Sequence, residues 1–298
     1  MGLAKGSKLG KYVLIQQIGS GGMGVVYLAE HTVMKRRVAI KVLPARLVKD
    51  QKSLERFHRE AQAIAALDHP NIVRAYNVDN EGSVHYLVME YVDGRDLEKI
   101  VEKEGPLEPA RAVRFIRQAA DGLAHAHARE LVHRDIKPSN LLIDRNDSVH
   151  ILDLGLARRF VSSEPKGTAE QQENVVGTTD YLAPEQALGA RDIDGRADIY
   201  SLGCTLYFLL TGAPPFCGKS LAECLVKHQM EEAPSIADLR PDVSPELCDI
   251  CRRMMAKKPE DRYTAAELRD ALLELYPPAE GERSYGSSTS IRKPRLPS

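Results

Sequence analysis

The chain lacks tryptophan, has few aromatic residues of any kind, and contains no long apolar run. Phe, Tyr and Trp together make up 5% of its 298 residues. No segment approaches the roughly 18 consecutive apolar residues of a transmembrane helix, and no signal peptide opens the sequence. We therefore expect a cytoplasmic location.

An excess of charge of one sign is also lacking. Lys and Arg number 41 against 42 acidic residues, so no overall field would draw the chain to nucleic acid or to a membrane surface. We therefore expect no nucleic-acid partner. The hydrophobic content of 43% and charged content of 28% are typical of a soluble globular protein, which at this length forms one large domain or two lobes.

The five cysteines form no regular disulfide pattern, which favours reduced thiols. Cys248 and Cys251 do make a CxxC pair, but the pair lies in a helix-patterned segment and no second pair follows it. Zinc binding or redox use is therefore the less favoured alternative. His125 and His127 are two residues apart and would diverge on a helix, so they are poor candidates for metal ligands.

The pattern of apolar residues changes along the chain. Over the first ~95 residues strand patterns dominate, as in "RRVAIKVL", interrupted by one helical pattern in "SLERFHREAQAIAAL". Later segments are helical, including "DIYSLGCTLYFLLTG", which is apolar almost all round and is expected at the centre of a lobe. The sequence predicts an α+β fold with a small β-rich lobe on a large helical one. The region 277–298 has little apolar content and is expected to be a disordered tail.

A glycine-rich stretch, "IGSGGMGVVYLAE", places Gly19, Gly21 and Gly24 in a G-x-G-x-x-G pattern. Glycines allow the backbone to approach phosphate closely, although a simple flexible turn is the alternative. A strand rather than a helix follows, which argues against a dinucleotide-binding fold. A second stretch, "GAPPFCGKS", imitates a P-loop, but its glycine spacing is wrong and its two prolines lack N–H donors.

Two charged residues fall on apolar faces of predicted elements. The strand alternation puts Lys41 on one face with Ala39 and Leu43, where an unpaired ammonium is costly. Glu60 lies along the apolar stripe of the predicted helix. Either the two residues pair inside the protein, or Lys41 is at a surface edge and Glu60 is solvated.

The stretch "HRDIKPSN" gathers a carboxylate, an ammonium and a carboxamide within six residues: Asp135, Lys137 and Asn140. Asp153 follows, at the end of an apolar strand-like run. Carboxylate and carboxamide oxygens are ligands that Mg²⁺ accepts beside phosphate, which would leave Asp135 to accept a hydroxyl proton. The alternative is a structural hairpin in which Asn140 and Asp153 are turn residues.

These motifs together resemble those of the eukaryotic-type Ser/Thr protein kinase family, in particular its bacterial members. They occur in order over roughly residues 10 to 275 as "GSGGMGVV", "VAIK", "HRDIKPSN", "DLG" and "APE". Two positions depart from the usual pattern: Leu154 where Phe is common, and Tyr200 where many relatives have Trp. Both changes should affect packing rather than chemistry.

The resemblance implies a bilobal protein kinase fold with an N-terminal extension at 1–11 and a kinase domain at 12–276. The N-lobe would span about 12–92 and the C-lobe about 93–276. It also implies an active enzyme that uses ATP and Mg²⁺, or Mn²⁺ instead, to phosphorylate Ser and Thr of protein substrates and of itself in bacterial signalling. Relatives allow a homodimer through the N-lobe, and the chain would be the cytoplasmic domain if the whole protein is membrane-anchored.

The family's functional residues carry over by position. Asp135 would accept the substrate proton, Lys137 would neutralise the γ-phosphate, and Thr178 would support both. Lys41, fixed by Glu60, would hold the α- and β-phosphates, and Asn140 and Asp153 would bind magnesium. The remaining implied nucleotide contacts are Ile18, Gly19, Ser20, Gly21, Gly22, Met23, Gly24, Val25, Val26, Ala39, Met89, Glu90, Val92, Asp96 and Leu142. Glu185 and Arg262 resemble a buried structural ion pair.

The resemblance also suggests regulation by phosphorylation between Asp153 and Glu185. Arg134 would pair with a phosphorylated residue and so order this segment. Thr168 is the first candidate for that residue, and Glu170 and Glu173 could partly replace a phosphate.

Two rival functions differ in class from an active protein kinase. A pseudokinase would bind nucleotide or partners without catalysis, but Lys41, Asp135, Asn140 and Asp153 are all present. A small-molecule kinase of related fold is disfavoured by "GTTDYLAPEQ", which resembles a platform for peptide docking.

Overall fold

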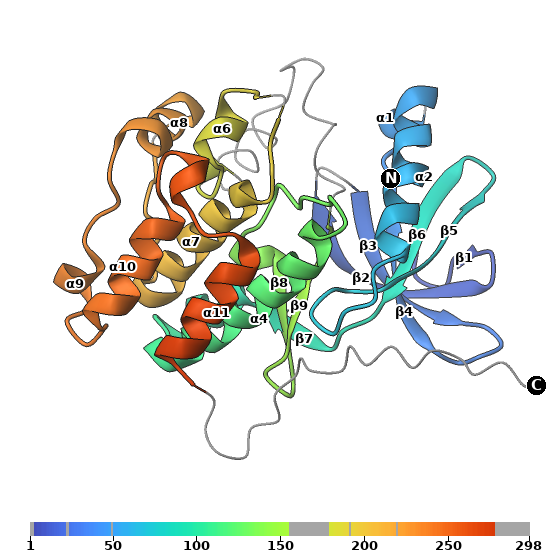
Figure 1. Cartoon of the computed structure of the whole chain (residues 1–298). Coiled ribbons are helices and arrows are strands. Elements are labelled where there is room, and N and C mark those ends of the chain that lie inside the picture. Colours follow the sequence, from blue (N-terminus) through green and yellow to red (C-terminus); the bar gives the residue numbers. More distant parts are fainter. Residues whose placement is uncertain are drawn as a thin grey trace, which may run out of the picture.

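The computed structural model describes residues 3–21, 24–48, 50–154, 179–190, 192–218 and 220–277. Strands gather in one lobe and helices in the other, with the chain passing from the first to the second after β6 (Figure 1). The α+β architecture expected from the sequence is confirmed.

The small lobe contains a six-stranded antiparallel sheet with the order β1-β2-β3-β4-β6-β5. Its strands are β1 (Lys8–Leu9), β2 (Tyr12–Gly21), β3 (Gly24–His31), β4 (Arg37–Val42), β5 (Ala75–Glu81) and β6 (Val84–Glu90).

The two faces of β4 belong to different clusters of buried side chains. Val38 and Ile40 pack in a small cluster on one face, whereas Ala39 and Leu43 join the main core that continues into the helical lobe. This division is the one that the alternation in "RRVAIKVL" predicts, because successive side chains of a strand point to opposite faces. It places Lys41 on the face of the main core.

Helices α1 (Ala45–Val48) and α2 (Gln51–Ala65) lie beside this sheet (Figure 1). The side chain of Asp50 caps α2 by accepting a hydrogen bond from the backbone N–H of Ser53. Phe57, Ala61 and Ile64 are the buried residues of α2, in agreement with the helical spacing of the sequence. Burial of this stripe fixes which face of α2 points to the core.

The large lobe is built around α7 (Arg196–Thr211), which is buried from Ala197 to Leu210. The all-round apolar pattern of this segment therefore does indicate a central helix. Around it lie α3 (Leu97–Glu104), α4 (Pro109–His127), α6 (Pro184–Ala187), α8 (Leu221–Met230), α9 (Ile236–Leu239), α10 (Pro245–Met254) and α11 (Ala265–Leu275), with two short 3₁₀ turns, η1 (Pro138–Asn140) and η2 (Pro259–Asp261).

A second, three-stranded sheet lies where the lobes meet. It consists of β7 (Gly94–Asp96), β8 (Leu141–Asp144) and β9 (Val149–Ile151), in that order. Ile151 bonds back to the small lobe: its N–H donates to the Asn71 carbonyl at 2.9 Å, and its carbonyl accepts from Val73 N–H at 3.0 Å. These two hydrogen bonds tie β9 to the segment that leads into β5 of the small lobe.

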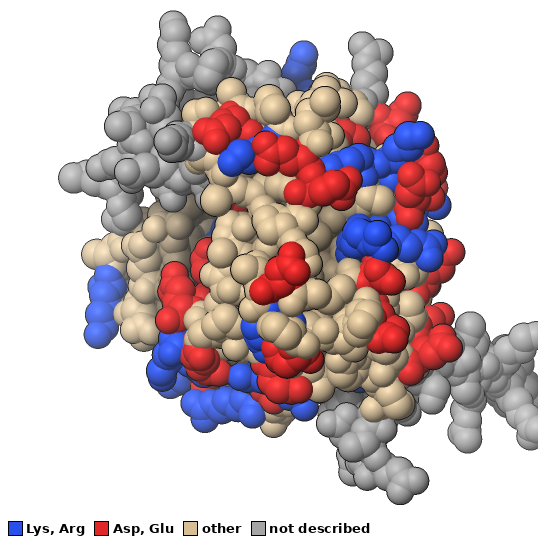
Figure 2. Space-filling model, turned by 90° about the vertical axis from the view of Figure 1, so that its left-hand side faces the viewer, with Lys and Arg blue, Asp and Glu red and all other residues tan. Residues whose placement is uncertain are grey.

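On the helical end of the molecule, acidic and basic side chains are interspersed over the surface (Figure 2). Among the described residues, no helix is both long enough and apolar enough to span a bilayer.

Candidate active site

The predicted catalytic residues of "HRDIKPSN" come together on the segment between α4 and β8. Lys137 Nζ lies 3.2 Å from Asp135 Oδ2. The Asn140 amide donates to Asp135 twice, to the backbone carbonyl at 2.7 Å and to Oδ2 at 3.1 Å. The Asp135 side chain is 17% exposed, so a substrate group can reach its carboxylate.

This segment has little regular structure, yet buried hydrogen bonds hold it. Asp198, which α7 carries with no solvent exposure, accepts the backbone N–H groups of His133 at 2.8 Å and Arg134 at 2.7 Å. It also contacts His127 Nε2 at 2.8 Å. Arg134 has a positive φ of 69°, a conformation that costs energy unless neighbouring contacts impose it. Asp198 supplies such a contact.

Asp198 is absent from the residues singled out in the sequence, although a signal for it existed. It is a carboxylate inside a helix that is otherwise apolar almost all round, and a buried charge of this kind requires hydrogen-bond partners. What the sequence does not indicate is which N–H groups those are, because they lie more than sixty residues earlier in the chain.

Lys41 faces the helical lobe from the middle of the sheet. Its backbone pairs with Val26 of β3 and Leu87 of β6, and the residue is 4% exposed. Its ammonium lies 2.8 Å from Asp153 Oδ1. Burial alone would raise the pKa of Asp153, but the charge and hydrogen bond of Lys41 outweigh burial and lower that pKa. The pair therefore joins the two lobes across the candidate site.

The sequence leaves open whether Glu60 pairs with Lys41, and the structure shows an ion pair of Lys41 with another carboxylate. Among the ion pairs between described residues, that of Lys41 is with Asp153; Glu60 is not without an interaction either. The reason the sequence could not choose is physical: a buried ammonium requires an anion within reach, and two carboxylates satisfied that condition. The prediction that Lys41 points inward is correct.

The residues expected around adenine and ribose lie on neighbouring strands. Ala39 of β4 is paired with Met89 of β6, and both are buried. Asp96 of β7 is paired with Leu142 of β8. The Asp96 carboxylate also caps α3, accepting from the Lys99 backbone N–H at 2.9 Å. Glu90, the last residue of β6, and Val92, on the connection between the lobes, are both half-buried.

The glycine-rich hairpin is formed by the ends of β2 and β3. Gly19 pairs with Val26, Ser20 with Val25, and Gly21 with Gly24. Gly24 has a φ of 127°, and a Cβ on it would lie 2.0 Å from the carbonyl oxygen of Val42. No other residue type fits there. Ile18, at the base of the hairpin, is 41% exposed.

Six of the predicted site residues lie outside the described residues. They are Gly22, Met23, Thr168, Glu170, Glu173 and Thr178. Arg134 is described, and its guanidinium donates to the Ile193 carbonyl at 3.3 Å.

Glu185 and Arg262 form the ion pair that the resemblance implies. Two guanidinium nitrogens of Arg262 bind the two carboxylate oxygens of Glu185 at 2.7 and 2.9 Å. The remaining donors of Arg262 reach the carbonyls of Ala256, Lys257 and Arg196. The Arg262 side chain has no solvent exposure, and a fully hydrogen-bonded guanidinium is what makes this burial tolerable.

The donors needed for a divalent cation are present in part. Among the described residues there is no group of three or more His, Cys, Asp or Glu that could hold a metal ion. Asn140 and Asp153 nevertheless offer an amide oxygen and a carboxylate, and Asp153 is 29% exposed. This small, hard-oxygen set suits Mg²⁺, which binds proteins through one or two side chains and completes its shell with phosphate and water.

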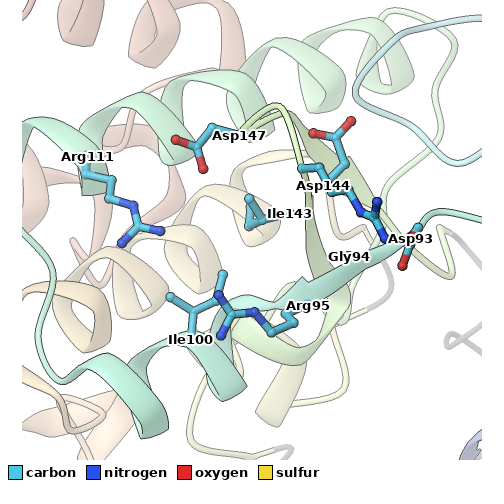
Figure 3. A pocket seen from close by; sticks show the side chains of 9 residues that line it. Asp93, Gly94, Arg95, Ile100, Arg111, Ile143, Asp144 and Asp147 are labelled. Carbon is cyan, nitrogen blue, oxygen red and sulfur yellow. Dashed lines mark ion pairs between the residues drawn. The ribbon is translucent and has the colours of Figure 1, made fainter.

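A cavity of about 260 Å³ lies near the connection between the lobes but shares no residue with the candidate site. It is lined by β7, β8, α3, α4 and the turn between β8 and β9 (Figure 3). Its charged groups are paired: Arg145 lies 2.6 Å from Asp93, and Arg95 and Arg111 both bind Glu104. No unsatisfied charge therefore marks it as an anion or cation site.

Comparisons with known proteins agree with the geometry of the candidate site. The family model described as "Protein kinase domain" matches residues 12–272. Serine/threonine-protein kinase PknB of Mycolicibacterium smegmatis is 42% identical over 271 residues, covering 89% of this chain and 43% of that protein. Serine/threonine-protein kinase PrkC of Bacillus subtilis is 41% identical, covering 88% of this chain and 40% of that protein. The chain thus spans about two fifths of the length of these curated relatives.

A comparison with solved structures also finds a kinase domain. A crystal structure of the Mycobacterium tuberculosis PknI kinase domain matches with a TM-score of 0.71 and 30% identity, covering 92% of this chain and 99% of that one.

Proposed function

The chain belongs to the protein kinase family, and on this premise we propose that it transfers the γ-phosphoryl group of ATP to Ser and Thr hydroxyls of proteins. Autophosphorylation and a role in bacterial signal transduction are part of the proposal. The observation that carries it is the cluster of Asp135, Lys137 and Asn140, with the Lys41–Asp153 ion pair facing it. Relatives named as Ser/Thr-protein kinases at about 40% identity support it.

The proposed chemistry assigns a task to each group in the cluster. Asp135 orients the substrate hydroxyl and accepts its proton. The amide of Asn140 bonds to Asp135 Oδ2, which holds the carboxylate in one rotamer. Lys137, 3.2 Å from the same oxygen, can turn to the transferred phosphoryl group, where its charge offsets the negative charge of the transition state.

The proposed nucleotide site lies between the sheet and this cluster. Lys41 would contact the α- and β-phosphates, and the glycine hairpin from Ile18 to Val26 would cover them. Mg²⁺, or Mn²⁺ instead, would be held by Asn140 and Asp153 and would neutralise charge on the phosphates. Adenine would contact Ala39, Met89 and Leu142 and the backbone at Glu90 and Val92, with Asp96 near the ribose.

We propose further that the kinase domain spans 12–276, with the N-lobe at about 12–92, the C-lobe at about 93–276 and a tail beyond. The family match over 12–272 supports these bounds. Glu60, Thr178, Arg134, Thr168, Glu170 and Glu173 keep their proposed supporting and regulatory roles.

A cytoplasmic location and a homodimer through the N-lobe also belong to the proposal. All five cysteines are free thiols, as is usual in a reducing compartment. In the N-lobe, the turn between β3 and β4 exposes Val33 to 80% and Met34 to 70%. Exposed apolar residues of this kind are common at protein contacts.

The experiment that tests the function compares two Asp→Asn variants. Each protein is incubated with Mg-ATP, and phosphoryl groups are counted by intact mass on the chain and on an added Ser/Thr peptide. Asp135→Asn should reduce transfer roughly 10²–10⁴-fold, as expected for loss of a general base, while ATP still raises the melting temperature.

The matched control is Asp147→Asn, on the β8–β9 turn. Asp147 has a φ of 58°, which Asn tolerates, and this variant should keep wild-type transfer. If Asp135→Asn retained more than a third of wild-type activity, Asp135 would not be the base. If the wild type bound ATP without transfer, the chain would be a pseudokinase.

A further inference from the structure

Two cysteines lie close together near the start of α8, one on the loop that precedes the helix and one on the helix itself. Cys217 is exposed on the connection from α7 to α8, whereas Cys224 lies on α8 with no solvent exposure. Both are free thiols.

The backbone next to Cys217 packs directly against Cys224. A Cβ placed on Gly218 would lie 2.7 Å from the backbone nitrogen of Cys224 and 3.2 Å from its Cα. Cys217 is one residue from this contact, a step of about 3.8 Å between consecutive Cα atoms. Disulfides join Cα atoms that are about 4.4–6.8 Å apart, so bond formation requires the loop at Gly218 to bring the Cα atom of Cys217 within this range of Cys224.

Cys224 also contacts the segment that precedes α6. Its Sγ donates to Asp180 Oδ1 at 3.5 Å. Burial raises the pKa of Asp180, and the hydrogen bond from Cys224 opposes that rise. The Cys224 thiol is therefore one of the groups that stabilise the half-buried carboxylate of Asp180.

The surroundings of the two thiols suit different steps of an oxidation. Lys227 Nζ donates to the Cys217 carbonyl at 2.8 Å, which ties the loop that carries Cys217 to α8, and the Cys217 side chain is exposed to solvent. Burial raises the pKa of Cys224 to about 11. Cys217 is thus suited to react first with an oxidant, and Cys224 to react second with the oxidised Cys217.

We propose that Cys217 and Cys224 form a reversible disulfide when a peroxide oxidises the protein. The Cys217 thiolate attacks hydrogen peroxide, the O–O bond breaks, and a sulfenic acid and water result after protonation. The Cys224 sulfur then attacks the Cys217 sulfur, the S–O bond breaks, and a second water leaves as the S–S bond forms. In total, two thiols and one hydrogen peroxide give one disulfide and two waters.

The disulfide has a consequence that rests on the proposed kinase function. Once bonded to Cys217, the Cys224 sulfur carries no hydrogen and cannot donate to Asp180. Asp180 lies in "GTTDYLAPE", the stretch that resembles a peptide-docking platform. We expect the KM for a peptide substrate to rise roughly fivefold, the equivalent of one lost hydrogen bond, with little change in the KM for ATP.

The crosslink is tested without any reference to activity. The reduced full chain is treated with hydrogen peroxide, the remaining thiols are alkylated, and intact mass is measured before and after reduction. The expected product has lost two hydrogens and takes up two fewer alkyl groups. Trypsin cuts after Lys219 and Lys227, so the two cysteines fall on separate peptides joined by the disulfide. Fragmentation must assign the first sulfur to Cys217 rather than to Cys204 on the same peptide.

Three serine variants provide the controls. Cys217→Ser and Cys224→Ser should each abolish the crosslink, and Cys217→Ser, at an exposed position, keeps the test valid if the buried variant folds poorly. Cys248→Ser, at a half-buried cysteine on α10, should leave the crosslink intact.

Several results would overturn the proposal. These are full alkylation of both cysteines after peroxide, a sulfinic acid at Cys217 beside an alkylated Cys224, or a crosslink only between two molecules. A chain that crosslinks as expected but transfers no phosphate would contradict the proposed kinase function and not the disulfide.

Discussion

The two sides of the candidate site are held in different ways. Lys41 lies on a central strand with neighbours on both sides, yet its ammonium depends on one ion pair with Asp153. Asp135 lies on a segment with little regular structure, yet its neighbours are bonded to the buried carboxylate of Asp198. Regular secondary structure is therefore a poor guide to which side is more firmly positioned.

The comparison predicts its largest effect at Asp198. Asp198→Ala leaves the backbone N–H groups of His133 and Arg134 without their acceptor and should lower the free energy of unfolding by about 3–5 kcal/mol. Urea denaturation measures this loss. Asp194→Ala is the control, because Asp194 pairs with Arg196 at the surface and should cost less than about 1 kcal/mol. Equal losses would show that the irregular segment does not depend on α7.

Substitution of Lys41 should affect phosphoryl transfer more than it affects stability. Lys41→Met keeps an apolar stem in a buried position but leaves Asp153 without its cation; because Asp153 is 29% exposed and water can reach it, the free energy of unfolding should fall by less than for Asp198→Ala. Phosphoryl transfer should fall roughly 10²–10³-fold, as expected when a charge-stabilising donor is lost.

A double mutant tests whether Lys41 and Asp153 work as a unit. Combined with Asp153→Asn, Lys41→Met should lose much less activity than the two single losses together. The same cycle with Glu60→Gln asks whether Glu60 is also coupled to Lys41. Additive losses for both partners would mean that Lys41 acts alone.

A further test concerns His228, a buried histidine of α8. His228 of α8 has its Nδ1 2.9 Å from the Tyr200 hydroxyl, and its ring lies 4.9 Å from that of Phe216. Burial, followed by the charge of Lys257, lowers the pKa of His228 from 6.5 to about 4.

The sign of the pH dependence follows from which state binds the proton. Below pH 6.5 the unfolded chain protonates this histidine, whereas the folded protein does so only near pH 4. The stabilisation by neutral His228 is complete above pH 6.5 and decreases by about 3 kcal/mol as the pH falls to about 4. His228→Gln should flatten this part of the stability profile relative to wild type. Parallel profiles would show that His228 does not titrate in this range.

The smallest effect is expected far from the site, at the start of α11. Thr264 and Glu267 form a capping box, with Glu267 Oε2 accepting from Thr264 N–H at 2.7 Å. Thr264→Ala should lower the free energy of unfolding by about 1 kcal/mol without changing activity, and Thr264→Ser should restore most of it. If Asp198→Ala lowered the free energy of unfolding by no more than Thr264→Ala does, the buried carboxylate of Asp198 would contribute no more to stability than a helix cap at the surface.

Much of this structure follows from local patterns in the sequence. The alternation around Lys41, the buried stripe of α2, the burial of α7 and the capping box at Thr264 all depend on residues within a few positions of each other. The helix α3, from Leu97 to Glu104, was not predicted, because its short amphipathic pattern follows a turn without a break.

The remaining features depend on contacts between distant segments. Periodicity places Lys41 and Glu60 on inward faces, but it cannot tell that Asp153, 112 positions after Lys41 in the chain, supplies the paired carboxylate. The same limit applies to Asp198 and to the contact between Gly218 and Cys224. Motif resemblance brought Glu185 and Arg262 together because it carries tertiary information that local chemistry lacks.

The ion pair of Arg262 should also affect the rate at which the protein unfolds. Its guanidinium joins Glu185, 77 positions earlier, to carbonyls on the segment before η2. Contacts over such sequence separations close only after the intervening helices have assembled. Interactions absent from the folding transition state act mainly on the unfolding rate. Arg262 should therefore prolong the lifetime of the folded C-lobe and leave the speed of its folding almost unchanged.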